Sequence, residues 1–143
     1  MAEILHDFVV KAPPDRIFEG VTTPSGLDRW WTKRSAGQAV DGAEYELWFG
    51  PQYDWRGTVS RCARNSEFEL LIVRADADWT GTRVGFRLEG GAGSTRVRFH
   101  HTGWPHANEN FRTSSYCWAM YLRILRRYLE YGEVVPYERR LEV

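Results

Sequence analysis

The chain has 143 residues, the length of one ordinary domain, which is enough to bury most of its apolar surface without disulfides or a metal ion. Its 19 Lys and Arg residues balance 19 Asp and Glu residues, and a net charge of zero argues against nucleic acid as a partner. The sequence shows no targeting segment and no apolar run of roughly 20 residues, so we expect a cytoplasmic protein without a membrane span.

The spacing of the cysteines and the aromatic content further limit the kinds of protein that this chain can be. Cys62 and Cys117 lie far apart and fit no metal-ligand or redox spacing, so we expect two buried free thiols and no disulfide, metal or cofactor. Aromatic residues make up 15% of the chain, with 7 Trp, 7 Tyr and 7 Phe. Rings in this number can line a cavity as well as fill a core.

The chain is predicted to begin with a strand and a helix. Residues 4–11 have the short, partly apolar composition of a strand, and the proline-rich residues 12–15 end it. A helix can begin there because proline is tolerated in the first turn and Asp15 complements the positive helix N-terminus.

Residues 25–34 predict a second, short helix. Leu27, Trp30 and Trp31 stand at helical spacing on one face, and Ser25 is the expected cap. One or two turns of helix are not stable alone in water, so this indole face must pack on a larger body.

The middle of the chain predicts antiparallel strands. Residues 45–49 alternate apolar and polar side chains, and further strands are expected at 55–62 and 68–73. The clearest alternation runs through 84–89 and 96–99 on either side of a glycine-rich turn, which predicts a hairpin with one apolar and one wet face.

A long helix is predicted from Ser114 to Tyr131, capped by Thr113, Ser114 or Ser115 and ended by Gly132. Its apolar arc is wider than a surface helix needs, so we expect the sheet to wrap it on several sides. The element order therefore predicts one α+β domain over residues 1–143, with a curved antiparallel sheet around one long helix. Residues 133–143 form a tail that we expect to add an edge strand or to pack on a second subunit of a homodimer.

These residues also carry a resemblance that covers nearly the whole chain. In their order and spacing they resemble the single-domain, bacterial-type members of the activator-of-heat-shock-protein-90-ATPase homologue family. That family is part of the SRPBCC group in the START and birch-pollen-allergen superfamily. The resemblance implies a helix-grip fold in which the two short helices lie at the open end of a cavity. The matching segments are Ala12-Pro13-Pro14, Thr23-Pro24, Trp30-Trp31, Trp79-Thr80, His101-Thr102-Gly103 and Tyr128-Leu129-Glu130-Tyr131-Gly132.

Several candidate sites have simpler structural interpretations. His100 and His101 are neighbours on a strand and point to opposite faces, so they cannot share a metal ion. His101 is expected inside, as a structural residue and as the best polar contact for a ligand.

Residues 76–81 copy half of a calcium loop, but Arg87 stands where a bidentate Glu is needed, which favours a turn. The arginines at 83, 87, 96 and 98 predict a solvated, ion-paired face of the sheet.

The leading functional hypothesis is a binding domain that holds a small apolar or aromatic molecule between the sheet and the long helix. An enzyme of the polyketide cyclase or aromatase type on the same pocket is one alternative, and a regulator of a chaperone ATPase acting through its surface is another. Polar groups expected at the cavity are Tyr53, Asp54, Arg56, His101 and Tyr121. The expected ligand contacts are Trp30, Trp31, Phe49, Val84, Phe86, Phe99, His101, Trp118, Tyr121 and Leu125.

Overall fold

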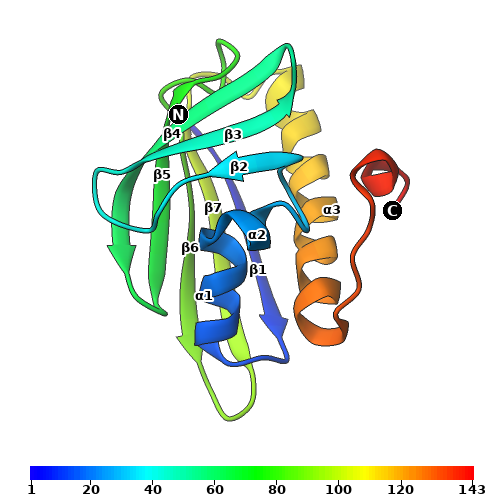
Figure 1. The fold of residues 1–143 in the computed structure, drawn as a ribbon. Coiled ribbons are helices and arrows are strands. Elements are labelled where there is room, and N and C mark those ends of the chain that lie inside the picture. The colour runs from blue at the N-terminus through cyan, green and yellow to red at the C-terminus, as the bar shows by residue number, and fades with distance from the viewer.

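The computed structural model describes all 143 residues and confirms the α+β class. Seven strands form one antiparallel sheet in the order β1-β7-β6-β5-β4-β3-β2, which curves around the long helix α3 (Figure 1). The strands are β1 (Ala2–Val10), β2 (Arg34–Ala36), β3 (Glu44–Gly50), β4 (Tyr53–Ala63), β5 (Glu67–Arg74), β6 (Arg83–Gly90) and β7 (Thr95–Trp104). The helices are α1 (Pro14–Thr22), α2 (Pro24–Leu27), α3 (Glu109–Tyr131) and the 3₁₀ helix η1 (Tyr137–Glu142).

The β6–β7 hairpin shows the predicted alternation. Val84 and Phe86 are buried while Arg83 and Arg87 are exposed on the opposite face. Strand β1, the first of the chain, pairs with β7, the last, and the five other pairings join strands that are consecutive in the sequence. The short strand β2, which pairs with β3, has only three residues and was not anticipated from the sequence.

The predicted helix over 25–34 is wrong in its extent. Helix α2 ends at Leu27, and Trp30 and Trp31 lie in the turn that follows it. The carboxylate of Asp28 accepts hydrogen bonds from the hydroxyls of Thr32 and Ser35, at 2.7 and 2.8 Å, and these bonds direct the chain into β2. The polar side chains therefore end the helix that the apolar spacing alone would continue.

The cap of α2 also differs from the prediction. The hydroxyl of Thr23, not that of Ser25, accepts a hydrogen bond from the backbone N–H of Gly26 at 3.0 Å. The helix starts two residues earlier than a cap at Ser25 implied, because Pro24 fits its first turn.

Helix α3 begins at Glu109, five residues before the predicted start. Its cap is Asn108, whose side-chain oxygen accepts a hydrogen bond from the N–H of Phe111 at 3.0 Å, and not Thr113, Ser114 or Ser115. The predicted end is confirmed, because Gly132 stops the helix in the left-handed conformation with φ of 69°. The sheet covers α3 on one side, but the tail, rather than more sheet, covers another (Figure 1).

The tail of residues 133–143 adds no edge strand to the sheet. It folds into η1 against α3 of its own chain, and Arg140 is only 3% exposed there. The guanidinium of Arg140 donates hydrogen bonds to the carbonyls of Asp28, Thr32 and Val135, at 2.7, 3.2 and 3.1 Å. The tail thus ties the turn that holds Trp31 to the outer side of α3.

Two further expectations concern the cysteines and a membrane-spanning helix. Cys62 and Cys117 are free thiols, but both are half-buried rather than fully buried. None of the helices has the length and apolarity that crossing a membrane requires.

Candidate ligand-binding site

A pocket of about 350 Å³ lies between the first half of α3, the β3–β4 hairpin, the β5–β6 loop and η1. Eight of its wall residues are aromatic, and one, Asp76, is acidic. The wall is formed by Trp31, Phe49, Tyr53, Trp55, Asp76, Trp79, Asn110, Thr113, Ser114, Cys117, Trp118, Tyr121 and Tyr137. The position agrees with the cavity expected between the sheet and the long helix.

Five of these rings form a closed circuit, in which each ring packs against the next. The centroid distances are 5.5 Å from Trp31 to Phe49, 5.3 Å from Phe49 to Trp55 and 4.9 Å from Trp55 to Trp79. The circuit closes with 5.8 Å from Trp79 to Trp118 and 5.2 Å from Trp118 back to Trp31. Pairs at these distances are in the favourable range for aromatic packing, so the wall is rigid before any ligand arrives.

The residues that α3 contributes to the pocket lie on one face of the helix. Asn110, Ser114, Trp118 and Tyr121 follow one another at intervals of three or four residues and therefore share one face of the helix. The indole N–H of Trp79 donates to the hydroxyl of Ser114 at 3.2 Å, which fixes the loop ring against this helix face.

The loop of residues 76–81 is a turn, as interpreted, and not a calcium site. One carboxylate oxygen of Asp76 accepts from the backbone N–H groups of Asp78 and Trp79, at 3.0 and 2.8 Å. The side-chain amide of Asn110 donates to both Asp76 and Asp78, at 3.3 and 3.0 Å. No group of three or more acidic, histidine or cysteine side chains in the chain could hold a metal ion.

His101 is fully buried and satisfied by protein groups. The indole N–H of Trp118 can only donate, so the His101 Nδ1, 3.0 Å away, is an unprotonated acceptor. The proton therefore sits on Nε2 and is donated to the Thr82 hydroxyl at 2.8 Å, which donates in turn to the carbonyl of Trp79. Burial, with a smaller effect from His100, lowers the pKa of His101 to about 3, so the ring stays neutral.

Burial raises the pKa values of three ionisable groups in the pocket wall. Burial raises the pKa of Tyr121 to about 12, and it also raises the pKa values of the Cys117 thiol and the Tyr137 phenol. A general acid or base works best with a pKa near the operating pH. These three groups lie far from that condition at neutral pH.

The structure brings four of the ten expected ligand contacts to the pocket wall, namely Trp31, Phe49, Trp118 and Tyr121. The other six, Trp30, Val84, Phe86, Phe99, His101 and Leu125, are buried in the core and are not part of the wall. Trp30 is fixed there by a hydrogen bond from its indole to the carbonyl of Gly20 at 3.0 Å. Of the other expected polar groups, Tyr53 lines the pocket, whereas Asp54 and Arg56 pair with each other outside the wall.

Sequence reasoning missed most of the polar wall and part of the aromatic wall. The positions at 110, 113, 114 and 117 follow the same helical interval as Trp118 and Tyr121, and a correct helix start would have found them. Tyr137 had no such signal, because its place depends on how the tail folds. The residues missed are Trp55, Asp76, Trp79, Asn110, Thr113, Ser114, Cys117 and Tyr137.

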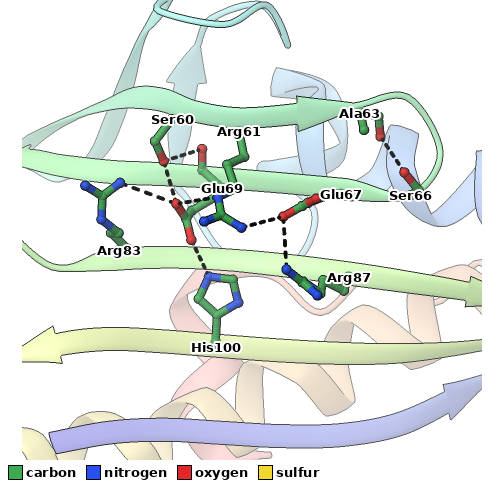
Figure 2. A network of polar contacts seen from close by, with 9 residues as sticks. All are labelled: Ser60, Arg61, Ala63, Ser66, Glu67, Glu69, Arg83, Arg87 and His100. Atoms are coloured by element: carbon green, nitrogen blue, oxygen red, sulfur yellow. Dashed lines mark hydrogen bonds and ion pairs between the residues drawn. The ribbon is translucent and has the colours of Figure 1, made fainter.

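The outer face of the sheet is ion-paired, as expected. Figure 2 shows Glu69 and Glu67 between the arginines of neighbouring strands, with Arg83 3.4 Å from Glu69 and Arg87 3.7 Å from Glu67. His100 lies on this face, opposite His101, and its Nε2 is 2.7 Å from Glu69. Three of the four expected arginines, Arg83, Arg87 and Arg98, have carboxylate partners there, whereas Arg96 forms no ion pair, so the expectation of an ion-paired face holds for three of the four positions.

Comparison with known proteins identifies relatives. The sequence profile of the family described as Activator of Hsp90 ATPase homolog 1-like protein matches residues 11–130. The chain is similar to the Aha1 dimer from Colwellia psychrerythraea, with 29% identity and a TM-score of 0.84, over 93% of this chain and 99% of that one.

Two further solved structures share the fold at lower identity, which is evidence for the fold alone. Protein SSP2350 from Staphylococcus saprophyticus is 18% identical with a TM-score of 0.77, over 94% of this chain and 96% of that one. CalU16 from Micromonospora echinospora is 20% identical with a TM-score of 0.75, over 98% of this chain and 84% of that one. No protein with a curated description matches the sequence.

Proposed function

Because the chain belongs to the family of Activator of Hsp90 ATPase homolog 1-like proteins, we propose that its aromatic pocket binds a small apolar or aromatic molecule without transforming it. The observation that carries this proposal is the closed circuit of five rings in the wall of a pocket of about 350 Å³. Preformed, largely apolar pockets of this size are where proteins hold small ligands. We propose the cytoplasm as the place of action.

A binding role fits the pocket better than a cyclase or aromatase role. A general base must accept a proton near neutral pH, and Tyr121 and Cys117, whose pKa values are raised by burial, are protonated there. His101 has both ring nitrogens engaged by Trp118 and Thr82, behind the wall rather than on it.

The test is native mass spectrometry of freshly purified protein, compared with the denatured chain. We expect an additional mass that is lost on denaturation. The Cys117→Trp variant places a large ring in the pocket and is expected to abolish the additional mass. Its matched control is Tyr116→Trp, because Tyr116 is the adjacent residue on α3, is 81% exposed and does not line the pocket.

The control variant should retain the additional mass. Retention of that mass in folded Cys117→Trp would place the ligand elsewhere and overturn the proposal. If the wild type carries no additional mass, a fragment screen by NMR is the second measurement. The absence of any fragment that shifts the pocket resonances would also overturn the proposal.

A second candidate function is regulation of a chaperone ATPase through the surface, and the family description is the observation that favours it. The relative from Colwellia psychrerythraea is described as a dimer, which supports a homodimer as a further proposal. Pull-down with the host chaperone, with and without ATP, tests the first, and light scattering after gel filtration tests the second. A monomeric mass at every protein concentration would contradict the dimer.

A further inference from the structure

The pocket wall carries negative charge and no positive charge. Asp76 is its one acidic residue, and no Lys or Arg lines it. The Asp76 carboxylate accepts hydrogen bonds from neutral backbone and amide N–H groups, and the Asn110 amide links it to Asp78. The side-chain and backbone donors to these two carboxylates are thus neutral, and neither carboxylate forms an ion pair within the protein.

Two cationic side chains, Arg140 and Lys33, lie over the ring of Tyr137, with the Lys33 ammonium 5.8 Å from its centroid. The guanidinium carbon of Arg140 lies 5.3 Å from the centroid of the Tyr137 ring, and its N–H groups donate to the carbonyls of Asp28, Thr32 and Val135. Backbone carbonyls therefore hold the Arg140 guanidinium beside the Tyr137 ring.

Distance along α3 also separates this arginine from Asp76. Asp76 is bonded to Asn110, whereas Arg140 affects the ionisation of Tyr121, eleven residues further along the helix. Eleven residues of α-helix span about 16 Å. The Asp76 end of the pocket is therefore the negative end.

Aromatic faces attract cations, and the attraction increases when the site is desolvated. Trp79 and Trp118 are 8% and 2% exposed, so protein atoms cover most of both rings, while the half-buried Trp55 packs 4.9 Å from Trp79 and Asp76 is exposed. A positive group here would gain both the ring quadrupoles and the Asp76 carboxylate. An anionic group would meet the same carboxylate with no cation to offset it.

We propose that the ligand class of this pocket is the organic cation, a protonated or quaternary amine carried on an apolar or aromatic body. This inference rests on the proposed binding function and specifies its ligand. The ammonium group lies at the Asp76 end, and the apolar body lies along the aromatic circuit towards Tyr121.

The test compares two probes of the same shape, the phenyltrimethylammonium cation and neutral tert-butylbenzene. Their binding is followed by the indole N–H signals of the protein in NMR titrations at low ionic strength. We expect the wild type to bind the cation about tenfold more tightly than the neutral probe. Asp76→Asn retains the size and one acceptor oxygen of the side chain but loses its charge, and we expect it to reduce this preference to the few-fold that the rings alone provide; the readout is the ratio of the two affinities within each variant, so that a general change in binding does not count.

The matched control is Asp41→Asn, which removes the same charge from the loop between β2 and β3, away from the pocket wall. It should retain the preference for the cation. If the neutral probe binds as tightly as the cation, or if Asp76→Asn and Asp41→Asn act alike, the cation inference is overturned while the binding function stands. If neither probe shifts an indole signal at millimolar concentration, the cation inference fails, and a negative fragment screen would then remove the binding function as well.

Discussion

Glu69 is a carboxylate on the outer face of the sheet whose side chain is only 9% exposed. Burial raises its pKa, but hydrogen bonds from Ser60 and His100 outweigh that effect and leave the pKa below its usual value. Gly85 makes this possible, because a Cβ at that position would lie 2.5 Å from the His100 ring. The missing side chain lets the His100 ring lie over β6 and reach the carboxylate on β5.

The depressed pKa of Glu69 predicts a loss of stability in acid. A carboxylate whose pKa is lower in the folded state stabilises the fold above its unfolded pKa of about 4.5 and loses that contribution as the pH falls through the folded value. Glu69→Gln should lower the free energy of unfolding by about 1–3 kcal/mol at pH 7. Urea denaturation between pH 7 and pH 3 should show a shallower acid decline for this variant than for the wild type.

Glu89→Gln is the control for this measurement, because Glu89 forms an ion pair with Arg98 at 2.9 Å but its side chain is 56% exposed. An exposed pair contributes at most about 1 kcal/mol, so this variant should follow the acid decline of the wild type. Equal pH dependence in the wild type and Glu69→Gln would show that the buried network does not carry the effect.

At the scale of elements, the start of α3 decides the polar part of the pocket. The Asn108 cap places the helix start nearly two turns earlier than the serines at 114 and 115 would, and so brings Asn110 and Thr113 to the pocket wall. Asn108→Ala should destabilise the protein by about 1 kcal/mol, because the N–H of Phe111 loses its acceptor. Thermal unfolding followed by circular dichroism measures the change.

Ser115→Ala is the matched control at the start of α3. Ser115 is an alternative cap by sequence, but it lies inside the helix, where alanine is the better helix former. The control should be neutral or slightly stabilising. A larger loss of stability in Ser115→Ala than in Asn108→Ala would contradict the assigned helix start.

The sequence predicts those features of the fold that depend on residues close together in the chain, and misses those that depend on distant residues. Strand alternation and the glycine-rich turn gave the β6–β7 hairpin, because both depend on neighbours in the chain. Gly132 ended α3 where expected for the same reason. The turn after α2 depends on Asp28 reaching Ser35, and β2 depends on pairing with β3, so neither leaves a local pattern.

The candidate site shows the same limit. Trp31, Phe49, Trp118 and Tyr121 were expected at the pocket because large rings on apolar faces must be buried somewhere near the helix and sheet. An apolar pattern cannot tell a wall from a core, so Phe86 and Phe99 were expected at the pocket and lie in the core instead. Trp79 lies at the wall because Asp76 closes the turn of residues 76–81. The sequence predicts this turn but not the place of Trp79.

At the scale of the whole molecule, we propose that residues 1–143 form one domain in which the tail completes the pocket. Tyr137 lines the pocket and donates from its hydroxyl to the carbonyl of Phe49 at 3.3 Å, across 88 positions of sequence. Arg140 fixes the turn behind Trp31 through the carbonyls of Asp28 and Thr32. The tail is therefore expected to stabilise the rest of the domain and to close one side of the cavity.

Deletion of residues 133–143 tests this role of the tail. The sheet and α3 should still form, because the core cluster lies before Gly132, and far-ultraviolet circular dichroism should confirm it. Loss of the Arg140 hydrogen bonds, offset in part by the entropy of the freed segment, should destabilise the domain by on the order of 2 kcal/mol. The melting temperature should then fall by about 4–8 °C. Tryptophan emission should shift to longer wavelength as Trp31 becomes accessible to water.

Deletion of residues 142 and 143 alone is the control for the tail. It removes the end of the chain but keeps Tyr137 and the buried Arg140, so both the melting temperature and the emission should match those of the full chain. If the longer deletion also leaves both unchanged, and the pocket probes bind as they do to the full chain, the tail is a passive extension and the pocket is built by the sheet and α3 alone.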